Sequence, residues 1–188
     1  MATGSYTTQN DLLLNNLMEF YKDESNLNNM LKIITGESKI SLRIVDWFVT
    51  NYAKKYYTLF QIEVDGNTRR FKVYVDYKLK LKAYSKKRFD PFCRWDRISI
   101  PYKGSTHIET TIGQLNFFKW VLENKIVQHI DENYDVIEKD MNNRNSTSKR
   151  KEIVVDTNTK TRKKREELSV SATKSIKKEK IEIIVNFT

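Results

Sequence analysis

The strongest constraint on the fold is a period-two alternation of apolar and polar residues on both sides of a tight turn. Phe60, Ile62 and Val64 alternate with polar residues, the pair Asp65–Gly66 is typical of a two-residue hairpin turn, and the alternation resumes at Phe71. Apolar positions then continue through 73, 75, 77, 79, 81 and 83. Because successive strand residues point to opposite faces, the sequence predicts a β-hairpin whose second strand runs through residues 70–84, with a bend near Asp76.

Other segments carry apolar residues at helical spacing. Residues 10–21, 27–34 and 41–55 show it, and Gly36 is placed to end the second of these helices. Thr111 and Gln114 match a capping box, after which apolar residues keep helical phase to Met141, or about eight turns. Residues 97–100 predict a short strand that ends at Pro101. The expected fold class is α+β, with a small antiparallel sheet of three or four strands packed by N-terminal helices and one long C-terminal helix.

The composition changes abruptly after Met141. Of the formal net charge of +10, residues 142–188 contribute 13 Lys and Arg against 6 Asp and Glu, with almost no aromatic residue to build a core. We therefore expect a flexible N-terminus over 1–9, one domain over 10–141 and a disordered basic tail over 142–188. Residues 181–186 are the candidate for a short terminal strand.

The lysine-rich part of the hairpin is the main candidate site. On the predicted strand the basic residues alternate onto one face, where phosphates of a nucleic acid would neutralise them, and two tyrosines among them could stack on bases. The candidate nucleic-acid-binding residues are Arg70, Lys72, Tyr74, Lys78, Lys80, Lys82, Tyr84, Lys86, Lys87, Arg88 and Arg94. The competing interpretation is a solvated sheet face whose lysines discourage edge pairing.

The tail offers a second, purely electrostatic contact. Its clusters suit phosphate binding and a nuclear-import signal equally well. The basic residues concerned are Lys149, Arg150, Lys151, Arg162, Lys163, Lys164 and Arg165.

The segment from Arg88 to Arg94 combines a proline turn with two phenylalanines. It suits a recognition loop, or equally a structural corner in which both rings enter the core and Asp90 hydrogen-bonds the turn. Cys93 is the single cysteine, so intramolecular disulfides and cysteine-based zinc fingers are excluded. The acidic residues at 131, 132, 135, 138 and 140 are read as a solvated helix face.

Enzyme motifs do not occur in the sequence. It contains no glycine-rich phosphate loop, no G-x-S-x-G and no H-E-x-x-H, and we expect no catalytic residue, metal or cofactor. A pocket joining Asp46, Asp90 and an arginine would be the observation that favours an enzyme. The apolar runs are too short to span a bilayer, and the first residues lack the pattern of a secretory signal, so we expect no membrane insertion and an intracellular protein.

Three segments resemble an uncharacterised protein family encoded by giant nucleocytoplasmic large DNA viruses. They are Ser41 to Tyr52, Tyr77 to Arg94 and Thr111 to Trp120, and the resemblance spans roughly residues 40–141. It implies a viral protein made in the host cytoplasm, at the viral factory, or in the nucleus, and a candidate for packaging in the virion. It implies no activity, ligand or catalytic residue.

Two functions follow as hypotheses. The first is a non-enzymatic nucleic-acid-binding accessory protein for replication, transcription or genome packing, with DNA or RNA as its partner. The alternative is a virion structural or assembly protein whose basic face contacts other viral proteins. The oligomeric state stays open.

Overall fold

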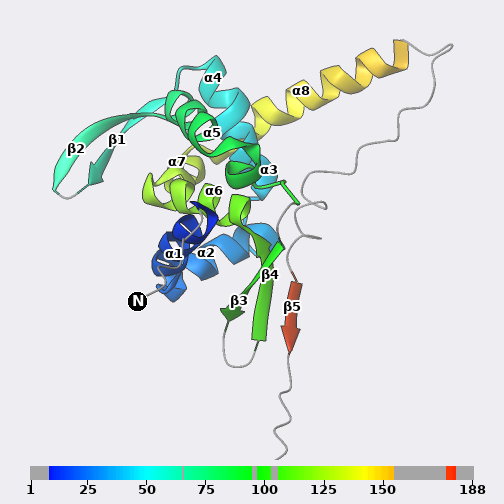
Figure 1. The fold of residues 1–188 in the computed structure, drawn as a ribbon. Coiled ribbons are helices and arrows are strands. Elements are labelled where there is room, and N and C mark those ends of the chain that lie inside the picture. Colours follow the sequence, from blue (N-terminus) through cyan, green and yellow to red (C-terminus); the bar gives the residue numbers. More distant parts are fainter. Residues whose placement is uncertain (1–8, 65, 95–96, 103–105, 155–176, 181–188) are drawn as a thin grey trace, which may run out of the picture.

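The computed structural model describes residues 9–64, 66–94, 97–102, 106–154 and 177–180. Over these residues the chain is α+β, mostly helical, with two small antiparallel sheets. Of the flexible N-terminus expected over 1–9, residues 1–8 lie outside the described residues, whereas Gln9 begins the first helix. The strand expected over 181–186 and the tail residues 162–165 also lie outside the described residues. Figure 1 shows a group of helices with a hairpin at one end and a second sheet at the other.

The first two helices agree with the predicted ones. Helix α1 covers Gln9–Tyr21 and helix α2 covers Glu24–Thr35. The Asp23 side chain caps α2 by accepting a hydrogen bond from the backbone N–H of Ser25 at 2.8 Å. Gly36 follows with φ of 80°, the left-handed conformation in which glycine commonly ends a helix.

The helix predicted over 41–55 is present in three consecutive parts. They are α3 (Leu42–Trp47), a π-helical turn η1 (Phe48–Tyr52) and α4 (Ala53–Lys55). The Ser41 hydroxyl caps α3 by accepting from the Ile44 N–H at 3.4 Å. Leu42, Val45 and Phe48 are buried, as their spacing predicts.

The hairpin is confirmed, and its continuation as a strand is wrong. Strand β1 (Leu59–Val64) pairs antiparallel with β2 (Asn67–Lys72), and Gly66 has a φ of 74° at the turn. The chain then forms helix α5 (Val73–Phe89) instead of extending the strand. Figure 1 shows the hairpin projecting from the helices and α5 lying among them.

Residues 73–84 satisfy a helical period as well as the period of two. Val73 is buried, Tyr77 and Leu81 are partly buried, and these three lie at i, i+4 and i+8 on one side of α5. Leucine, lysine and alanine are good helix formers, and Asp76 near the start and Lys86 and Lys87 near the end complement the helix dipole. Ser85, with φ of 62° and ψ of 169°, interrupts the helix before its last turn.

The long C-terminal helix is divided into three. Helices α6 (Ile112–Glu123), α7 (Ile126–Glu132) and α8 (Tyr134–Val154) are separated at Asn124–Lys125 and at Asn133. Each asparagine amide donates to the carbonyl four residues earlier, at 2.8 Å from Asn124 to Trp120 and at 2.9 Å from Asn133 to His129. These local bonds compete with helix continuation. The prediction of one uninterrupted helix is therefore wrong, and α8 also runs past Met141, where the tail was expected to begin.

The second sheet has the order β3–β4–β5. Strands β3 (Arg97–Tyr102), β4 (Thr106–Thr111) and β5 (Lys177–Lys180) pair antiparallel. Pro101 lies inside β3 opposite His107, and not beyond the strand's end as predicted. An edge strand tolerates a proline, since one of its sides needs no ladder hydrogen bond.

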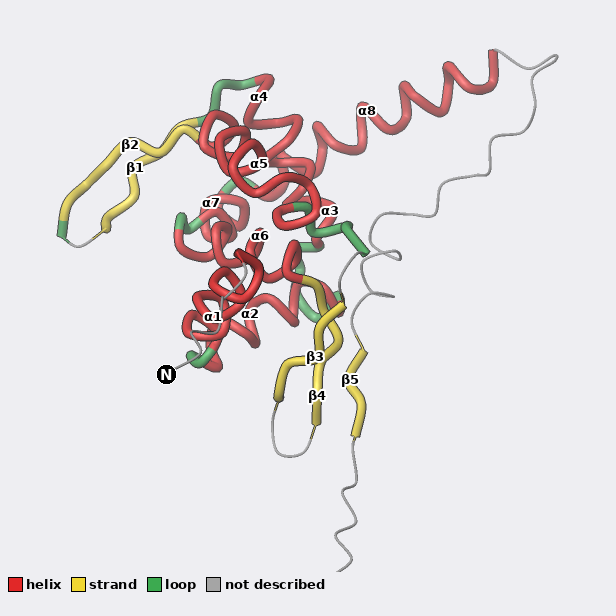
Figure 2. The backbone as a smooth tube through the Cα atoms, in the orientation of Figure 1, coloured by secondary structure: helices red, strands yellow, loops and turns green. Residues whose placement is uncertain are grey.

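Helix α6 lies at the centre of the core. The Thr111 hydroxyl accepts from the Gln114 N–H at 3.1 Å, so the predicted cap starts this helix, and the Gln114 carboxamide accepts from the Thr110 hydroxyl at 3.0 Å. Leu115, Phe118 and Val121 have no exposed surface. Figure 2 shows α6 among the other helices, between the two sheets.

Candidate nucleic-acid interface

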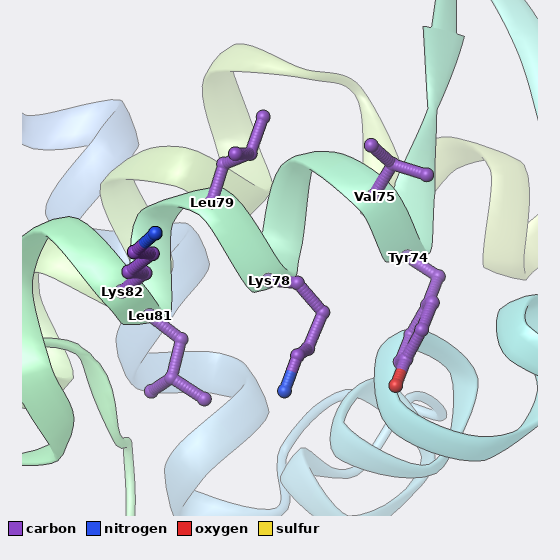
Figure 3. A pocket seen from close by; sticks show the side chains of 6 residues that line it. All are labelled: Tyr74, Val75, Lys78, Leu79, Leu81 and Lys82. Carbon is purple, nitrogen blue, oxygen red and sulfur yellow. The ribbon is translucent and has the colours of Figure 1, made fainter.

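Because residues 73–89 form the helix α5, the candidate basic residues of this segment lie on different sides of the helix. Lys78 and Lys82 lie one turn apart and line a shallow groove of about 510 Å³ with Tyr74. Its apolar lining is Val75, Leu79 and Leu81. In Figure 3, Val75 and Leu79 project from one side of the helix, whereas Tyr74, Lys78 and Leu81 project from the other. We call this groove, together with Lys54 described below, the α5 basic groove.

Lys80 and Tyr84 belong to a different surface. They line a second cavity of about 450 Å³ together with Leu12 and Asn16 of α1. The Tyr84 ring is stacked on the buried Phe89 ring with centroids 6.0 Å apart. Tyr84 is therefore part of the packing, and the prediction that all basic and aromatic residues of 70–84 share one face is wrong.

The other candidate nucleic-acid-binding residues lie on the hairpin, in the last turn of α5, in the corner after it and in α8. Arg70 and Lys72 pair with Gln61 and Leu59, so both lie on the hairpin face opposite the Phe60–Phe71 pair. Lys86, Lys87 and Arg94 are exposed. Arg88 donates to the Gln9 side chain at 3.3 Å. The backbone of α8 includes residues 149–151, whose side chains are not described.

The one acidic residue of α5 points inward. The indole N–H of Trp120 in α6 donates to the Asp76 carboxylate at 2.6 Å, and this is a partly buried, charge-assisted bond. The carboxylate of Asp76, which lies between basic residues in the sequence, is thereby directed toward α6. As a result, the charged side chains that α5 itself contributes to the groove are all positive.

Lys54 joins this groove from another element. Its ammonium lies 5.7 Å from the centre of the Tyr74 ring, a cation–π distance, and the side chain is exposed. Sequence reasoning did not select Lys54 because twenty residues separate it from Tyr74. Only the packing of α4 against α5 brings the two together.

The segment after α5 is a structural corner. The Asp90 carboxylate accepts from the Phe92 N–H at 2.9 Å, Pro91 is buried, and the Phe89 ring has no exposed surface. The Asn116 amide donates to the Arg88 carbonyl at 2.8 Å and ties the corner to α6. Of the two interpretations of this segment, these contacts support the corner.

The charge of Asp90 acts on the buried carboxyl group of Asp46. Burial first, and then the nearby charge of Asp90, raises the pKa of Asp46 from 3.8 to about 6. Burial also raises the pKa of Tyr77 to about 12, reinforced by the charges of Asp46 and Asp90. The Asp90 carboxylate itself is held by the turn that it caps, through the hydrogen bond from the Phe92 N–H.

We expect the Asp46→Asn substitution to stabilise the fold at neutral pH. The folded pKa of Asp46 exceeds its unfolded pKa, so the folded state binds the proton more tightly and stability is lost as pH rises from about 4 to about 6. Each pKa unit corresponds to about 1.4 kcal/mol and the pKa rises from 3.8 to about 6, so the variant should gain up to about 3 kcal/mol at pH 7. Urea unfolding across pH 4–8 measures this. An Asp135→Asn control at an exposed position should keep the wild-type profile, and an identical profile in Asp46→Asn would refute the assignment.

The expected acidic helix face includes one residue with a defined role. Asp140 accepts from the Lys55 ammonium at 2.6 Å, from the Trp47 indole at 3.2 Å and from the Tyr56 hydroxyl at 3.2 Å. Burial opposes ionisation, yet these hydrogen bonds hold the pKa of Asp140 below its ordinary value. Asp140 therefore links α8 to α3 and α4.

Within the described ranges, no group of three or more His, Cys, Asp or Glu side chains is arranged to hold a metal ion. No helix of the described part of the chain has the length and apolarity needed to cross a membrane.

Comparisons with known proteins place the chain in a wider context. A family model described as "Family of unknown function (DUF7197)" matches residues 4–187. An uncharacterized protein of Acanthamoeba polyphaga mimivirus, a giant virus, is 46% identical over 128 residues, which cover 65% of this chain and 49% of that protein. The chain thus spans about half the length of this curated relative. No solved structure matches the chain.

Proposed function

We propose that this chain, which belongs to the DUF7197 family of unknown function, binds nucleic acid through the α5 basic groove and catalyses no reaction. The inward orientation of Asp76 is the observation that carries this proposal. The positive surface consists of Lys54, Lys78 and Lys82. The one carboxylate of α5 is directed toward Trp120 and does not neutralise it. Phosphate contacts from such lysines give salt-dependent affinity with little sequence preference.

Exposed lysines along a helix can follow the sugar–phosphate backbone of a nucleic acid without reading its sequence. The similarity to a giant-virus protein supports a viral context, in which the proposed role is that of an accessory protein in replication, transcription or genome packing. The basic residues after Met141 would add a general electrostatic attraction.

A second candidate function is contact with another viral protein during virion assembly. Val75 and Leu79 favour it, because 53% and 60% of their surfaces are exposed on α5. Exposed apolar side chains grouped on one element commonly mark protein interfaces. Under this alternative the lysines would border a protein contact and would not bind phosphate.

Lysine reactivity distinguishes the two functions. We expect a mixed-sequence oligonucleotide to protect Lys54, Lys78 and Lys82 of the intact chain from acetylation, because bound phosphates would cover their ammonium groups. Lys22, Lys32 and Lys39 are exposed and line no part of the groove, so they should stay reactive. Mass spectrometry of the acetylated peptides measures both sets. Equal reactivity of the groove lysines with and without oligonucleotide would favour the protein-contact function.

A further inference from the structure

Tyr57 occupies a position that the fold alone does not explain. Its side chain is 87% exposed, and its backbone has a φ of 49°, which is uncommon for a residue other than glycine. It is the second residue after α4, at a helix end where the Thr58 N–H donates to the Ala53 carbonyl at 3.1 Å. This six-to-one bond is the Schellman ending of a helix, and the residue at the Tyr57 position is usually glycine. The tyrosine therefore strains the backbone and packs little.

Cationic side chains surround this end of α4. The Lys55 ammonium lies 4.6 Å from the Tyr56 ring centre and 2.6 Å from Asp140. Lys139 and Arg144 of α8 line the same surface groove of about 550 Å³. Of the charged residues that line this groove, Lys55, Lys139 and Arg144 are basic and Asp140 is acidic, and Asp140 accepts from Lys55. Tyr56 is half exposed and holds the groove in place through its bond to Asp140.

The helix α4 contributes a lysine to each of two surfaces. Lys54 lies over the Tyr74 ring of the α5 basic groove, while the next residue, Lys55, lines the groove formed with Lys139 and Arg144 of α8. Tyr57 follows two residues later with its ring in solvent. A strand whose phosphates contact Lys54 would therefore pass close to an exposed aromatic ring.

We propose that Tyr57 stacks on an unpaired base and makes the chain prefer single-stranded over double-stranded nucleic acid. This inference rests on the proposed function and names its substrate class. In a duplex the faces of the bases are covered by their neighbours, so an exposed ring reaches only a base that is unstacked. Stacking on an aromatic side chain tolerates any base and adds to phosphate contacts without requiring sequence recognition. The backbone strain at Tyr57 is then retained for binding.

The test separates binding from folding with one substitution. Tyr57→Gly relieves the left-handed backbone and removes the ring, so we expect its melting temperature to rise by a few degrees. Its affinity for a single-stranded oligonucleotide should fall about tenfold. Affinity for the duplex of the same sequence should change less than about twofold, since the duplex offers no base to stack. Tyr57→Phe keeps the ring and should retain single-strand affinity.

Ser85→Gly is the matched control. Ser85 is also exposed and has a positive φ of 62°, so glycine should raise the melting temperature there too, without altering strand preference. Fluorescence anisotropy of the full chain with both oligonucleotides measures each affinity.

The outcomes are distinct. If Tyr57→Gly binds single strands as tightly as wild type, or loses single-strand and duplex binding equally, Tyr57 does not stack on a base and the inference is wrong. The proposed function would still hold in either case if binding to the duplex remains salt-dependent. If the wild-type chain binds neither oligonucleotide, the proposed function fails and the inference fails with it.

Discussion

Charge reversal at Lys54, Lys78 and Lys82 is expected to weaken binding of a mixed-sequence oligonucleotide on the order of 30-fold or more at low salt. Each reversal removes one phosphate contact and adds one repulsion, and exposed ionic contacts contribute up to about 1 kcal/mol apiece. Glutamate and lysine have similar helix propensities, so the helix α5 itself should be little changed. Fluorescence anisotropy of the intact triple variant gives the affinity, and its melting temperature verifies the fold.

The matched control reverses Lys22, Lys32 and Lys39. This variant has the same net charge as the first and keeps all basic residues after Met141, so generic attraction falls equally in both. All three control residues are exposed, and Lys39 carries a cation–π contact to Tyr134 just as Lys54 does to Tyr74. Equal losses in the two variants would mean that binding depends on total charge alone, and the α5 basic groove would not be the site.

Replacing Gly113 by alanine is expected to destabilise the fold by about 2 to 3 kcal/mol. A Cβ atom at Gly113 would lie 2.9 Å from the Asp90 carbonyl oxygen and 3.0 Å from that of Lys87. Both are backbone atoms: the Lys87 carbonyl belongs to the last turn of α5, and the Asp90 carbonyl belongs to the corner that follows it. The bonds to Phe92 and from Asn116 hold that corner in place, so it has little freedom to move away. The clash should outweigh the better helix propensity of alanine.

Urea unfolding measures this cost. Gly36→Ala is the control, because its φ of 80° strains alanine while no neighbour lies within 4 Å, and it should cost about 1 kcal/mol. The difference between the two variants then reports the close approach of α6 to the corner. A Gly113→Ala protein as stable as wild type would show that α6 and α5 do not pack as closely as described.

Local signals in the sequence were sufficient for several elements. The helices around Leu17 and Met30, the glycine stop at Gly36, and the β1–β2 turn at Gly66 depend on neighbouring residues, and the structure confirms them. The cap at Thr111 is equally local. Each of these features depends on residues only a few positions away in the sequence.

The helix α5 could not be identified in this way. Val73, Tyr77 and Leu81 fit a helix period, yet with the intervening apolar residues they also fit a strand. Contacts with α6 favour the helix, above all the bond from Trp120 to Asp76 and the packing of Phe89 against Trp120. These partners lie about 30 to 45 residues away in the sequence, so no local pattern includes them.

The candidate site changed for the same reason. On a strand, Lys78, Lys80 and Lys82 would share a face, whereas on a helix Lys80 turns toward α1 and Lys78 and Lys82 stay together. Lys54 enters only through tertiary packing. The density of lysines could be seen in the sequence, but which of them line one groove could be seen only in the fold.

The salt dependence of oligonucleotide binding is the most direct test of the central claim. We predict that the affinity of the wild-type chain falls linearly with salt on logarithmic axes. The slope of the Lys54, Lys78 and Lys82 triple variant should be shallower by about two to three, since each lost phosphate contact removes roughly 0.7 to 0.9 from the slope. No binding by the wild-type chain at low salt, or the same slope in both proteins, would contradict the claim that α5 presents a nucleic-acid-binding surface.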